Sequence, residues 1–453
     1  MAAVKNIGDI AAERLSKAAC ADNFGDIHPP YDRQQAVVEA DRCYFCHDAP
    51  CMTACPTSID VPLFIRQIST GNVEGSAKTI LQQNIMGGMC ARVCPTETLC
   101  EQVCVRNEGG EGKPVKIGLL QRFAVDALMA TGTHPFERAK SSGKRVAVVG
   151  AGPAGLACAH RLATLGHAVV LYEARDKLGG LNEYGIAAYK TIDGFAQAET
   201  QFILSVGGIE VKSGMRLGED ISLGKLRGEY DAVFLGLGMG AVNALGLEGE
   251  DLDNAIDAVD FIARLRQAKD PSKIPVGRRI VVIGGGMTAI DIAAQTKLLG
   301  AEEVTLVYRR GQAQMKASAY EQELAQTRGV TIRHWAEPKR LIGEGKTLAA
   351  VEFERTAPGS NGGLKGTGEH FTLAADMVFR AIGQKFVAAS IDGDDQSPKL
   401  VKGRIAIDGQ RKTSLADVWA GGDCVDASED LTVAAVEDGK IAAQAIDQFL
   451  TES

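Results

Sequence analysis

The sequence has few aromatic residues, no long apolar run and no excess of positive charge. Phe, Trp and Tyr make up 5% of the 453 residues. No apolar run of about 18 residues occurs, so no membrane-spanning helix is predicted. The net charge is −8, so the charge balance gives no indication of nucleic-acid binding. The first residues lack the apolar core of a signal peptide, and we therefore expect a soluble, cytoplasmic protein with reduced thiols.

Glycine, by contrast, is abundant, with 52 residues. Many glycines and few aromatics suit the glycine-rich turns by which α/β proteins bind nucleotides. The chain is long enough for two or three domains, each with its own core. The composition therefore favours a multidomain α/β protein.

Eight of the eleven cysteines lie in two short runs. The spacing is C-x2-C-x4-C-x3-C-P in the first run and C-x3-C-P-x4-C-x3-C in the second. A disulfide framework is typical of short secreted domains, and structural zinc favours two C-x2-C pairs, of which only one is present. Runs that contain Cys-Pro are typical of ferredoxin-type sites, which favours two [4Fe–4S] clusters in a helical domain of residues 1–140. The cysteines are Cys43, Cys46, Cys51 and Cys55, then Cys90, Cys94, Cys100 and Cys104.

A dinucleotide-binding fingerprint follows a linker that is predicted at residues 141–143. The apolar strand Val146–Val149 leads into a Gly-x-Gly-x-x-Gly turn and a helix, and the next strand ends at Glu173. The helix N-terminus attracts phosphates, and Glu173 is placed to accept hydrogen bonds from a ribose. An acid there favours a free 2′-hydroxyl, so this site is predicted to bind FAD. The tight turn, the approach of the pyrophosphate and the helix–strand packing are assigned to Gly150, Gly152 and Gly155.

A second copy of the fingerprint occurs in the segment RRIVVIGGGMTAIDIAA. Its turn consists of Gly284, Gly286 and, in place of the third glycine, Ala289. The strand after its helix ends in Arg309 and Arg310 instead of an acid. Because arginine favours a 2′-phosphate, this site is predicted to bind NADP(H). A solvated loop is the alternative for the two arginines.

Three further strands run into glycine. Those that begin at Asp231 and Asp376 are interpreted as crossovers between two Rossmann units. A strand near the C-terminus ends in Gly-Gly-Asp, a motif expected on the ribityl or pyrophosphate oxygens of FAD. We therefore predict an FAD-binding domain of residues 141–270 and 384–453, with an NAD(P)H-binding domain of residues 271–383 inserted in it. Further FAD contacts are expected from Gly180, Gly422, Asp423 and Thr432.

These parts together predict a converter of electron pairs into single electrons. A nicotinamide gives a flavin two electrons as hydride, whereas iron–sulfur clusters carry one electron at a time. Hydride transfer requires stacking of the two rings rather than an acid or base, so no catalytic side chain is assigned. His47 and Arg92 lie among the cysteines, where they have either a packing role or a role in tuning a cluster potential.

The order of the motifs resembles, over nearly the whole chain, the reductase portion shared by dihydropyrimidine dehydrogenase and the small subunit of glutamate synthase. The dihydropyrimidine dehydrogenase family has an unusual glutamine cluster ligand in a segment like I-G-x-L-Q-x-F-A, and Gln121 stands in that context here. Glutamate synthase small subunits usually carry an acid at this place. The motifs that carry the resemblance are CxxCxxxxCxxxCP, CARVCPTxxLCxxxC, GAGPAGLACA, GGGMTAIDIA, VYRRG and WAGGD.

The resemblance implies which residues bind iron. One cluster would be held by Cys43, Cys46, Cys51 and Cys104, a set that we call the Cys43 site. The other would be held by Cys55, Cys94, Cys100 and Gln121, which we call the Gln121 site. Cys90 would bind no iron. The resemblance also implies that Lys316 faces the 2′-phosphate together with the arginine pair.

The implied function is that of an NAD(P)H-oxidising subunit with FAD and two [4Fe–4S] clusters. NADPH is expected to be favoured over NADH, although split bacterial enzymes of this family often use NADH. The chain has no FMN barrel before it stops at Ser453, so a separate FMN- and iron–sulfur-containing partner is expected to reduce uracil or thymine to the dihydropyrimidine, in a hetero-oligomer. The alternatives are a glutamate synthase small subunit, a sibling reductase with another partner, or an adaptor without electron flow. The intact glycine turn and Asp423 argue against the adaptor.

Overall fold

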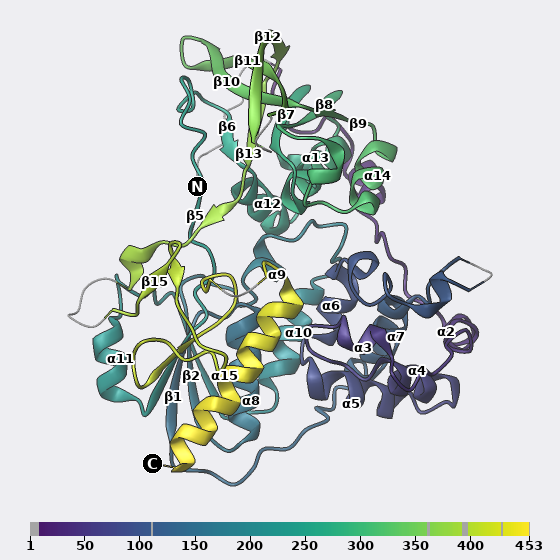
Figure 1. The fold of residues 1–453 in the computed structure, drawn as a ribbon, viewed down its shortest axis with the longest axis vertical. Coiled ribbons are helices and arrows are strands. Elements are labelled where there is room, and N and C mark those ends of the chain that lie inside the picture. Colours follow the sequence, from purple (N-terminus) through teal and green to yellow (C-terminus); the bar gives the residue numbers. More distant parts are fainter. Residues whose placement is uncertain (1–8, 110–111, 360–362, 392–396, 427–428, 453) are drawn as a thin grey trace. The chain divides into compact units, whose positions relative to one another are not determined.

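The computed structural model describes residues 9–109, 112–359, 363–391, 397–426 and 429–452 (Figure 1). The chain forms two compact units. The inserted unit consists of Met1–Ile27, Tyr184–Ile192 and Ala241–Lys385, and the cysteine-rich unit of His28–Glu183, Asp193–Gly240 and Phe386–Ser453.

The first part of the cysteine-rich unit is helical. In α4 (Val61–Ser69) the buried side chains are those of Val61, Phe64, Ile65 and Ile68, which recur at the spacing of one helix face. Side chains of Asp32, Asp60 and Asn72 accept backbone hydrogen bonds and cap three of the helices. The other helices are α2 (Arg33–Ala40), α3 (Pro50–Thr53), α5 (Val73–Gln83), α6 (Gly87–Val93) and α7 (Ile117–Met129).

The rest of this unit contains a parallel five-stranded sheet of order β17-β4-β1-β2-β3. The C-terminal strand β17 pairs with β4, so the chain returns to the first sheet after the insertion. Helices α8 and α15 lie side by side, and a Cβ on Gly439 would lie only 2.1 Å from the carbonyl oxygen of Ala154 (Figure 1). The elements are β1 (Arg145–Val149), α8 (Pro153–Thr164), β2 (Ala168–Glu173), α9 (Leu181–Tyr184), α10 (Phe195–Leu204), β3 (Ile209–Ser213), α11 (Leu223–Glu229), β4 (Ala232–Leu235), β15 (Leu400–Val401), β16 (Arg404–Ile405), β17 (Val418–Ala420) and α15 (Thr432–Glu452).

The inserted unit repeats this sheet, with strand order β6-β13-β7-β8-β9. A three-stranded antiparallel sheet, β10-β11-β12, stands between β9 and β13 in the chain. The unit begins earlier than the expected residue 271, because β6 already belongs to its sheet. Its elements are α1 (Lys17–Asn23), β5 (Ala241–Val242), β6 (Ala255–Asp257), α12 (Ala258–Gln267), β7 (Arg279–Gly284), α13 (Met287–Leu298), β8 (Glu303–Tyr308), α14 (Ala319–Thr327), β9 (Val330–His334), β10 (Ala336–Glu344), β11 (Thr347–Pro358), β12 (Leu364–Ala374), β13 (Met377–Ala381) and β14 (Gln384–Lys385).

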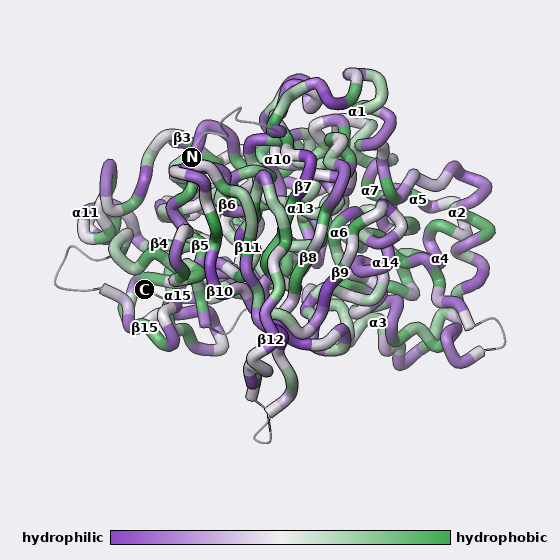
Figure 2. The backbone as a smooth tube through the Cα atoms, turned by 90° about the horizontal axis from the view of Figure 1, so that it is seen from above, coloured by the Kyte–Doolittle hydropathy of each residue, from purple (hydrophilic) through white to green (hydrophobic). Residues whose placement is uncertain are grey.

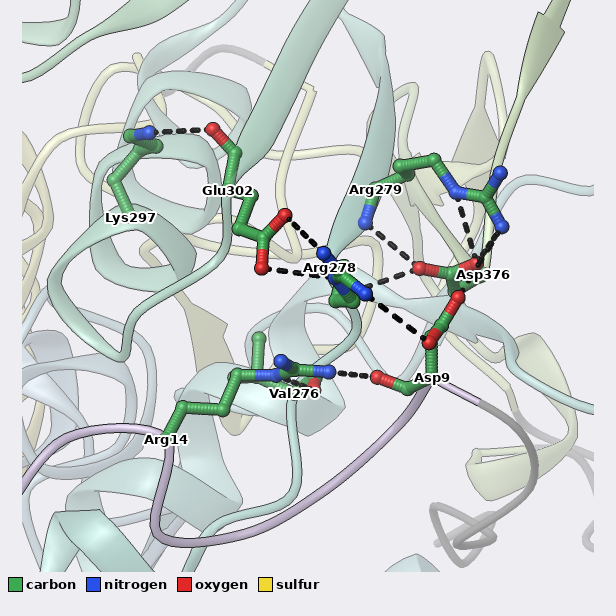
Figure 3. Close-up of polar contacts among 8 residues, drawn as sticks. All are labelled: Asp9, Arg14, Val276, Arg278, Arg279, Lys297, Glu302 and Asp376. Atoms are coloured by element: carbon green, nitrogen blue, oxygen red, sulfur yellow. Dashed lines mark hydrogen bonds and ion pairs between the residues drawn. The ribbon is translucent and has the colours of Figure 1, made fainter.

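The N-terminal segment belongs to the inserted unit, whereas residues 1–27 were expected in one domain with the cysteines. Ala11 and Val276 exchange backbone hydrogen bonds of 3.2 and 3.0 Å. Asp9 forms ion pairs of 3.7 Å with Arg278 and 3.6 Å with Arg279 (Figure 3). Because exposed ion pairs contribute little free energy, the backbone bridge is the stronger attachment.

Hydrophilic and hydrophobic stretches alternate along the tube of Figure 2. No helix in the described ranges has both the length and the apolar character that membrane crossing requires.

Candidate cofactor sites

The first glycine turn connects β1 to α8 and depends on the absence of side chains. Gly150 has a φ of +97°, and a Cβ there would lie 2.2 Å from the carbonyl oxygen of Gly236. A Cβ on Gly155 would lie 1.8 Å from the carbonyl oxygen of Gly150. Gly152 is different, since a Cβ there would meet only the Cα of Gly180, at 3.8 Å. Two glycines therefore permit the turn itself, and the third leaves open space at the N-terminus of α8.

Glu173 holds this turn against the end of β2. Its carboxylate is buried, and it accepts hydrogen bonds from the backbone N–H of Ala151 at 2.9 Å and of Arg175 at 2.8 Å. Each carboxylate oxygen has a further lone pair, so a ribose hydroxyl could still donate to it. Gly180 is also part of the turn, because a Cβ there would lie 2.8 Å from the Cα of Gly152.

The C-terminal glycine motif is anchored by a residue that sequence reasoning missed. Asp438 on α15 is buried, accepts a hydrogen bond of 2.8 Å from the N–H of Gly422 and one of 2.7 Å from Nε of Arg411. A Cβ on Gly421 would lie 2.7 Å from that of Asp438. An acid on the buried face of an amphipathic helix was the available signal.

Asp423 and Thr432 lie close to this anchor in the sequence and face different partners. The Asp423 carboxylate forms no hydrogen bond within the described part of the chain, and burial, with Asp430 adding, raises its pKa to about 6. A partly buried carboxylate without a donor fits a polyhydroxylated group such as the ribityl chain of FAD. Thr432 donates a hydrogen bond of 2.9 Å to the buried Asn182, and its hydroxyl oxygen can still accept a hydrogen bond.

The second glycine turn repeats the geometry of the first. A Cβ on Gly284 would lie 2.3 Å from the carbonyl oxygen of Ala381, so this position requires glycine. A Cβ on Gly286, at the start of α13, would meet no atom within 4 Å. Ala289 is fully buried in α13, where its methyl group takes the place of the third glycine. The turn again leaves open space at a helix N-terminus.

Three cations border this second turn. Arg309, Arg310 and Lys316 are exposed, and their side chains form no hydrogen bond or ion pair with any described residue. The backbone holds the segment in place, because the N–H of Lys316 donates to the carbonyl oxygen of Gly285 at 3.0 Å and Thr356 donates to that of Arg309 at 2.7 Å. Unpaired cations beside a phosphate-binding turn suit an additional phosphate group.

The four thiols of the Cys43 site line one small cavity. Apolar residues such as Val61, Ile65 and Ile117 form the rest of its wall. Burial, with Cys43 and Cys104 adding, raises the pKa of the Cys51 thiol to about 12. Iron would oppose this shift, since a metal ion favours the thiolate. The four thiol ligands and the apolar wall of the cavity therefore fit an iron–sulfur cluster.

The thiols of the Gln121 site form a second group. A hydrogen bond with Cys90 and burial raise the pKa of Cys94, and Cys100 and Cys55 add to the shift. Cys94 therefore lies near Cys90, Cys100 and Cys55, and the assignment of Cys55, Cys94, Cys100 and Gln121 to one cluster stays a prediction. Among the described residues, no three His, Cys, Asp or Glu side chains converge as the ligands of one metal ion would. A cluster does not require this convergence, because its ligands bind different iron atoms.

Gln121 is buried on α7, which packs against α6. Its Nε2 donates a hydrogen bond of 2.7 Å to the carbonyl oxygen of Gly87, and its amide oxygen accepts none from the described residues. The oxygen is therefore available to iron. Arg92 is buried in an ion pair of 2.7 Å with Asp126, whereas His47 is 99% exposed in its side chain.

Helix α6 is also contacted from the flavin-type Rossmann part. Glu199 on α10 is fully buried and accepts hydrogen bonds from the N–H groups of Gly88 at 2.8 Å and Met89 at 3.0 Å. Asn182 donates to the sulfur of Met86 at 3.8 Å. Sequence reasoning did not identify Glu199 or Asn182, since neither lies in a recognised motif.

Comparison with known families agrees with this geometry. A family described as dihydropyrimidine dehydrogenase domain II, 4Fe-4S cluster, matches residues 20–133, and the pyridine nucleotide-disulphide oxidoreductases match residues 144–439. The chain belongs to the pyridine nucleotide-disulphide oxidoreductase family. Within this family it groups with the FAD and iron–sulfur subunits of bacterial dihydropyrimidine dehydrogenase and glutamate synthase, and it is an NAD(P)H-dependent flavin and 4Fe–4S oxidoreductase subunit.

The chain is 35% identical to the NAD-dependent dihydropyrimidine dehydrogenase subunit PreT of Salmonella typhimurium, over 94% of this chain and 97% of the relative. It is 33% identical to the glutamate synthase [NADPH] small chain of Escherichia coli, over 94% of each. Mycobacterium tuberculosis FprA in complex with NADPH has the same fold over 68% of this chain and 85% of FprA, with a TM-score of 0.57 at 21% identity. Thioredoxin reductase of T. acidophilum has the same fold over 68% of this chain and 100% of the reductase chain, with a TM-score of 0.53 at 20% identity.

Proposed function

We propose that this chain takes hydride from NAD(P)H onto FAD and passes single electrons through two [4Fe–4S] clusters to an FMN-containing partner, which reduces uracil or thymine to the 5,6-dihydropyrimidine. The single observation that carries the proposal is Gln121, whose amide oxygen has no donor among the described residues while its nitrogen is fixed on the helix that leads to Cys94. The high similarity to subunits named dihydropyrimidine dehydrogenase supports it. We place the reaction in the cytoplasm, where thiols are reduced.

Each cofactor has a set of residues in this proposal. When bound, FAD accepts an electron pair and releases single electrons. The FAD-binding residues are Gly150, Gly152, Gly155, Glu173, Gly180, Gly422, Asp423 and Thr432. The NAD(P)H-binding residues are Gly284, Gly286, Ala289, Arg309, Arg310 and Lys316. Iron is bound by the Cys43 site and the Gln121 site.

The contacts within the cysteine-rich unit support an order for the two clusters. Helix α6 contacts Glu199, its N-cap Met86 contacts Asn182, and its C-cap is Cys94, so these contacts link the Gln121 site to the FAD-binding part. The charge of Cys51 contributes to the raised pKa of the Cys100 thiol. These two thiols, one from each site, therefore lie near each other. Tyr44, beside the Cys43 site, is exposed. We infer that electrons pass from FAD to the Gln121 site, then to the Cys43 site and the partner.

We also propose that NADPH is favoured over NADH. The three unpaired cations beside the second turn support this, since each can bind a 2′-phosphate. The relatives differ in this property by name, because the PreT subunits are NAD-dependent and the glutamate synthase is an NADPH enzyme.

Purification of the affinity-tagged chain from its native cells tests the proposal. An FMN-containing partner and NAD(P)H-dependent reduction of uracil by the complex are expected. A partner that forms glutamate from glutamine and 2-oxoglutarate would instead establish the second candidate, which the 33% identity to a glutamate synthase small chain favours. A purified chain whose flavin does not bleach with NADPH or NADH would contradict both.

A further inference from the structure

Glu199 is a fully buried carboxylate at the contact between α10 and α6. Its Oε1 accepts the two hydrogen bonds from Gly88 and Met89, whereas its Oε2 is buried without any hydrogen-bond partner in the described structure. The preceding residue of α6, Gly87, accepts the hydrogen bond from the amide of Gln121. Three consecutive residues of α6 thus join Glu199 to the ligand that distinguishes the Gln121 site.

The nearest cation does not neutralise Glu199 directly. The guanidinium of Arg92 lies 3.4 Å above the ring of Phe195 and forms its ion pair with Asp126, which also contacts Arg122 at 3.4 Å. Arg92 bonds the carbonyl oxygen of Gly88 at 3.0 Å, so both its charge and its donors are engaged elsewhere. A buried carboxylate without a contacting counter-ion is costly in its charged form.

The remaining titratable groups on the helices that pack against α10 leave this conclusion unchanged. These are Cys90 on α6 and Cys158, His160 and Arg161 on α8. Burial raises the pKa of Cys158 and lowers that of His160 to about 3, so both are neutral at physiological pH. For Glu199, burial raises the pKa to about 8, although the two hydrogen bonds and Arg92 oppose the shift. The carboxyl group of Glu199 is therefore present in both protonation states at pH values near 8.

We propose that Glu199 binds a proton when the cluster of the Gln121 site accepts an electron, and releases it when that electron moves on. The inference rests on the proposed function, because it requires this cluster. One electron enters the cluster from FAD, which the oxidation of NAD(P)H supplies, and one proton enters from water. The only bond that forms is the O–H bond of Glu199, and it breaks again on reoxidation.

Coulomb interaction sets the direction of the coupling. An added electron makes the cluster more negative, which disfavours a charged carboxylate nearby and raises its pKa in the reduced protein. On reduction of the cluster, Glu199 therefore takes up a proton at pH values between its own pKa in the oxidised protein and its higher pKa in the reduced protein. In that range the potential of the cluster falls as pH rises, and below the range it is constant.

A redox titration followed by EPR, on the full chain with its clusters and FAD, tests the coupling from about pH 6.5 to about pH 9.5. Above about pH 8 the potential of the Gln121-site cluster should fall by up to about 59 mV for each tenfold decrease in proton concentration, the one-electron value. Glu199→Gln keeps an oxygen for Gly88 and Met89 but does not titrate. In this variant the potential of the Gln121-site cluster should be the same at every pH. It should equal the wild-type potential at low pH, where Glu199 is neutral.

Asp126→Asn is the matched control, since it removes the other carboxylate near Arg92. It should retain the pH dependence, shifted to lower pH, because Asp126 raises the pKa of Glu199. The cluster of the Cys43 site is an internal reference, as Glu199 contacts none of its cysteines in the described structure. A pH-independent wild-type potential, or a Glu199→Gln variant with unchanged pH dependence, would overturn the inference.

Two further measurements keep the result decisive. If Glu199→Gln does not fold, infrared difference spectra of the wild type decide, since reduction above pH 8 must increase the C=O band of a protonated carboxyl group and an unchanged band overturns the coupling. Iron and acid-labile sulfide are assayed on every sample. A missing Gln121-site cluster in the wild type contradicts the proposed function, whereas an intact cluster with a constant potential contradicts the coupling alone.

Discussion

The side-chain nitrogen of Gln121 donates a hydrogen bond of 2.7 Å to the backbone carbonyl oxygen of Gly87. This bond fixes the orientation of the amide, because the nitrogen rather than the oxygen must face α6. The amide oxygen is left without a donor in the described structure. A glutamine in which only the oxygen is available is suited to bind iron, and the relationship gives the iron–sulfur assignment its sharpest test.

Gln121→Cys should keep the iron content but lower the potential of the Gln121-site cluster. A thiolate adds one negative charge to the ligand set, which makes the addition of an electron harder. Redox titration with EPR detection measures the shift, and stopped-flow should show normal flavin reduction with slower electron delivery to the partner. Gln102→Cys, the control, adds a thiol at an exposed position of the same region. It should change neither the cluster potential nor the rate of electron delivery. An unmoved potential in Gln121→Cys would show that Gln121 binds no iron.

Cys90→Ala should retain all of the iron. Eight cysteines and Gln121 provide nine candidate ligands for eight positions, and the structure places Cys90 beside Cys94, where its thiol hydrogen-bonds with that ligand. Iron and acid-labile sulfide assays compare it with Cys94→Ala, which should lose one cluster, about four irons per chain. A loss of one cluster in Cys90→Ala would refute the assignment.

Arg309→Ala and Arg310→Ala should each reduce kcat/KM for NADPH by about 10- to 100-fold, because a charge-assisted hydrogen bond contributes roughly 1.5–3 kcal/mol. The value for NADH, which lacks the 2′-phosphate, should stay nearly constant. Steady-state kinetics with both nucleotides and an artificial acceptor measure the ratio. Lys365→Ala, at an exposed position on β12, is the control. Equal wild-type kinetics with the two nucleotides would contradict the preference.

Asp438→Ala should weaken FAD binding and destabilise the cysteine-rich unit. The substitution leaves the buried N–H of Gly422 without its acceptor, at a cost of about 1–3 kcal/mol, and removes the ion pair of the partly exposed Arg411. Flavin content after gel filtration and the thermal unfolding midpoint measure the two effects. Asp447→Ala on the same helix, a half-exposed acid that contacts His167, should retain FAD. Full flavin occupancy in Asp438→Ala would exclude Asp438 as the anchor of the motif.

His160 should make the unit sensitive to acid. Burial lowers its pKa to about 3 in the folded protein, while the unfolded chain binds the proton near pH 6.5. Stability is therefore fully present above about pH 6.5 and is lost as pH falls towards 3, by up to about 1.4 kcal/mol per pH unit. Denaturant unfolding at several pH values should show a shallower loss in His160→Gln, whereas the exposed His47→Gln should follow the wild type. If the unfolding free energies of wild type and His160→Gln fell equally with decreasing pH, His160 would not cause the acid sensitivity.

The glycine turns and the strands and helices beside them could be predicted from the sequence, because their signals are local. Gly150 and Gly284 are required by backbone conformation and close approach, and both stand within a few residues of the apolar strand that leads into them. The split of the first Rossmann domain was also predictable, since the Gly-Gly-Asp motif at Asp423 marks a strand of that domain far along the chain.

Only the tertiary structure decided which distant residues meet. The attachment of Ala11 to Val276, the bond from Gly422 to Asp438 and the contact of Glu199 with α6 join segments that no periodic pattern or motif connects. Likewise, the spacing of the cysteines indicates clusters but does not divide eight thiols into two sets, because this division depends on how the helices fold around each cavity. Local sequence sets backbone conformation, and long-range packing sets the surroundings that determine pKa values, ligand sets and redox behaviour.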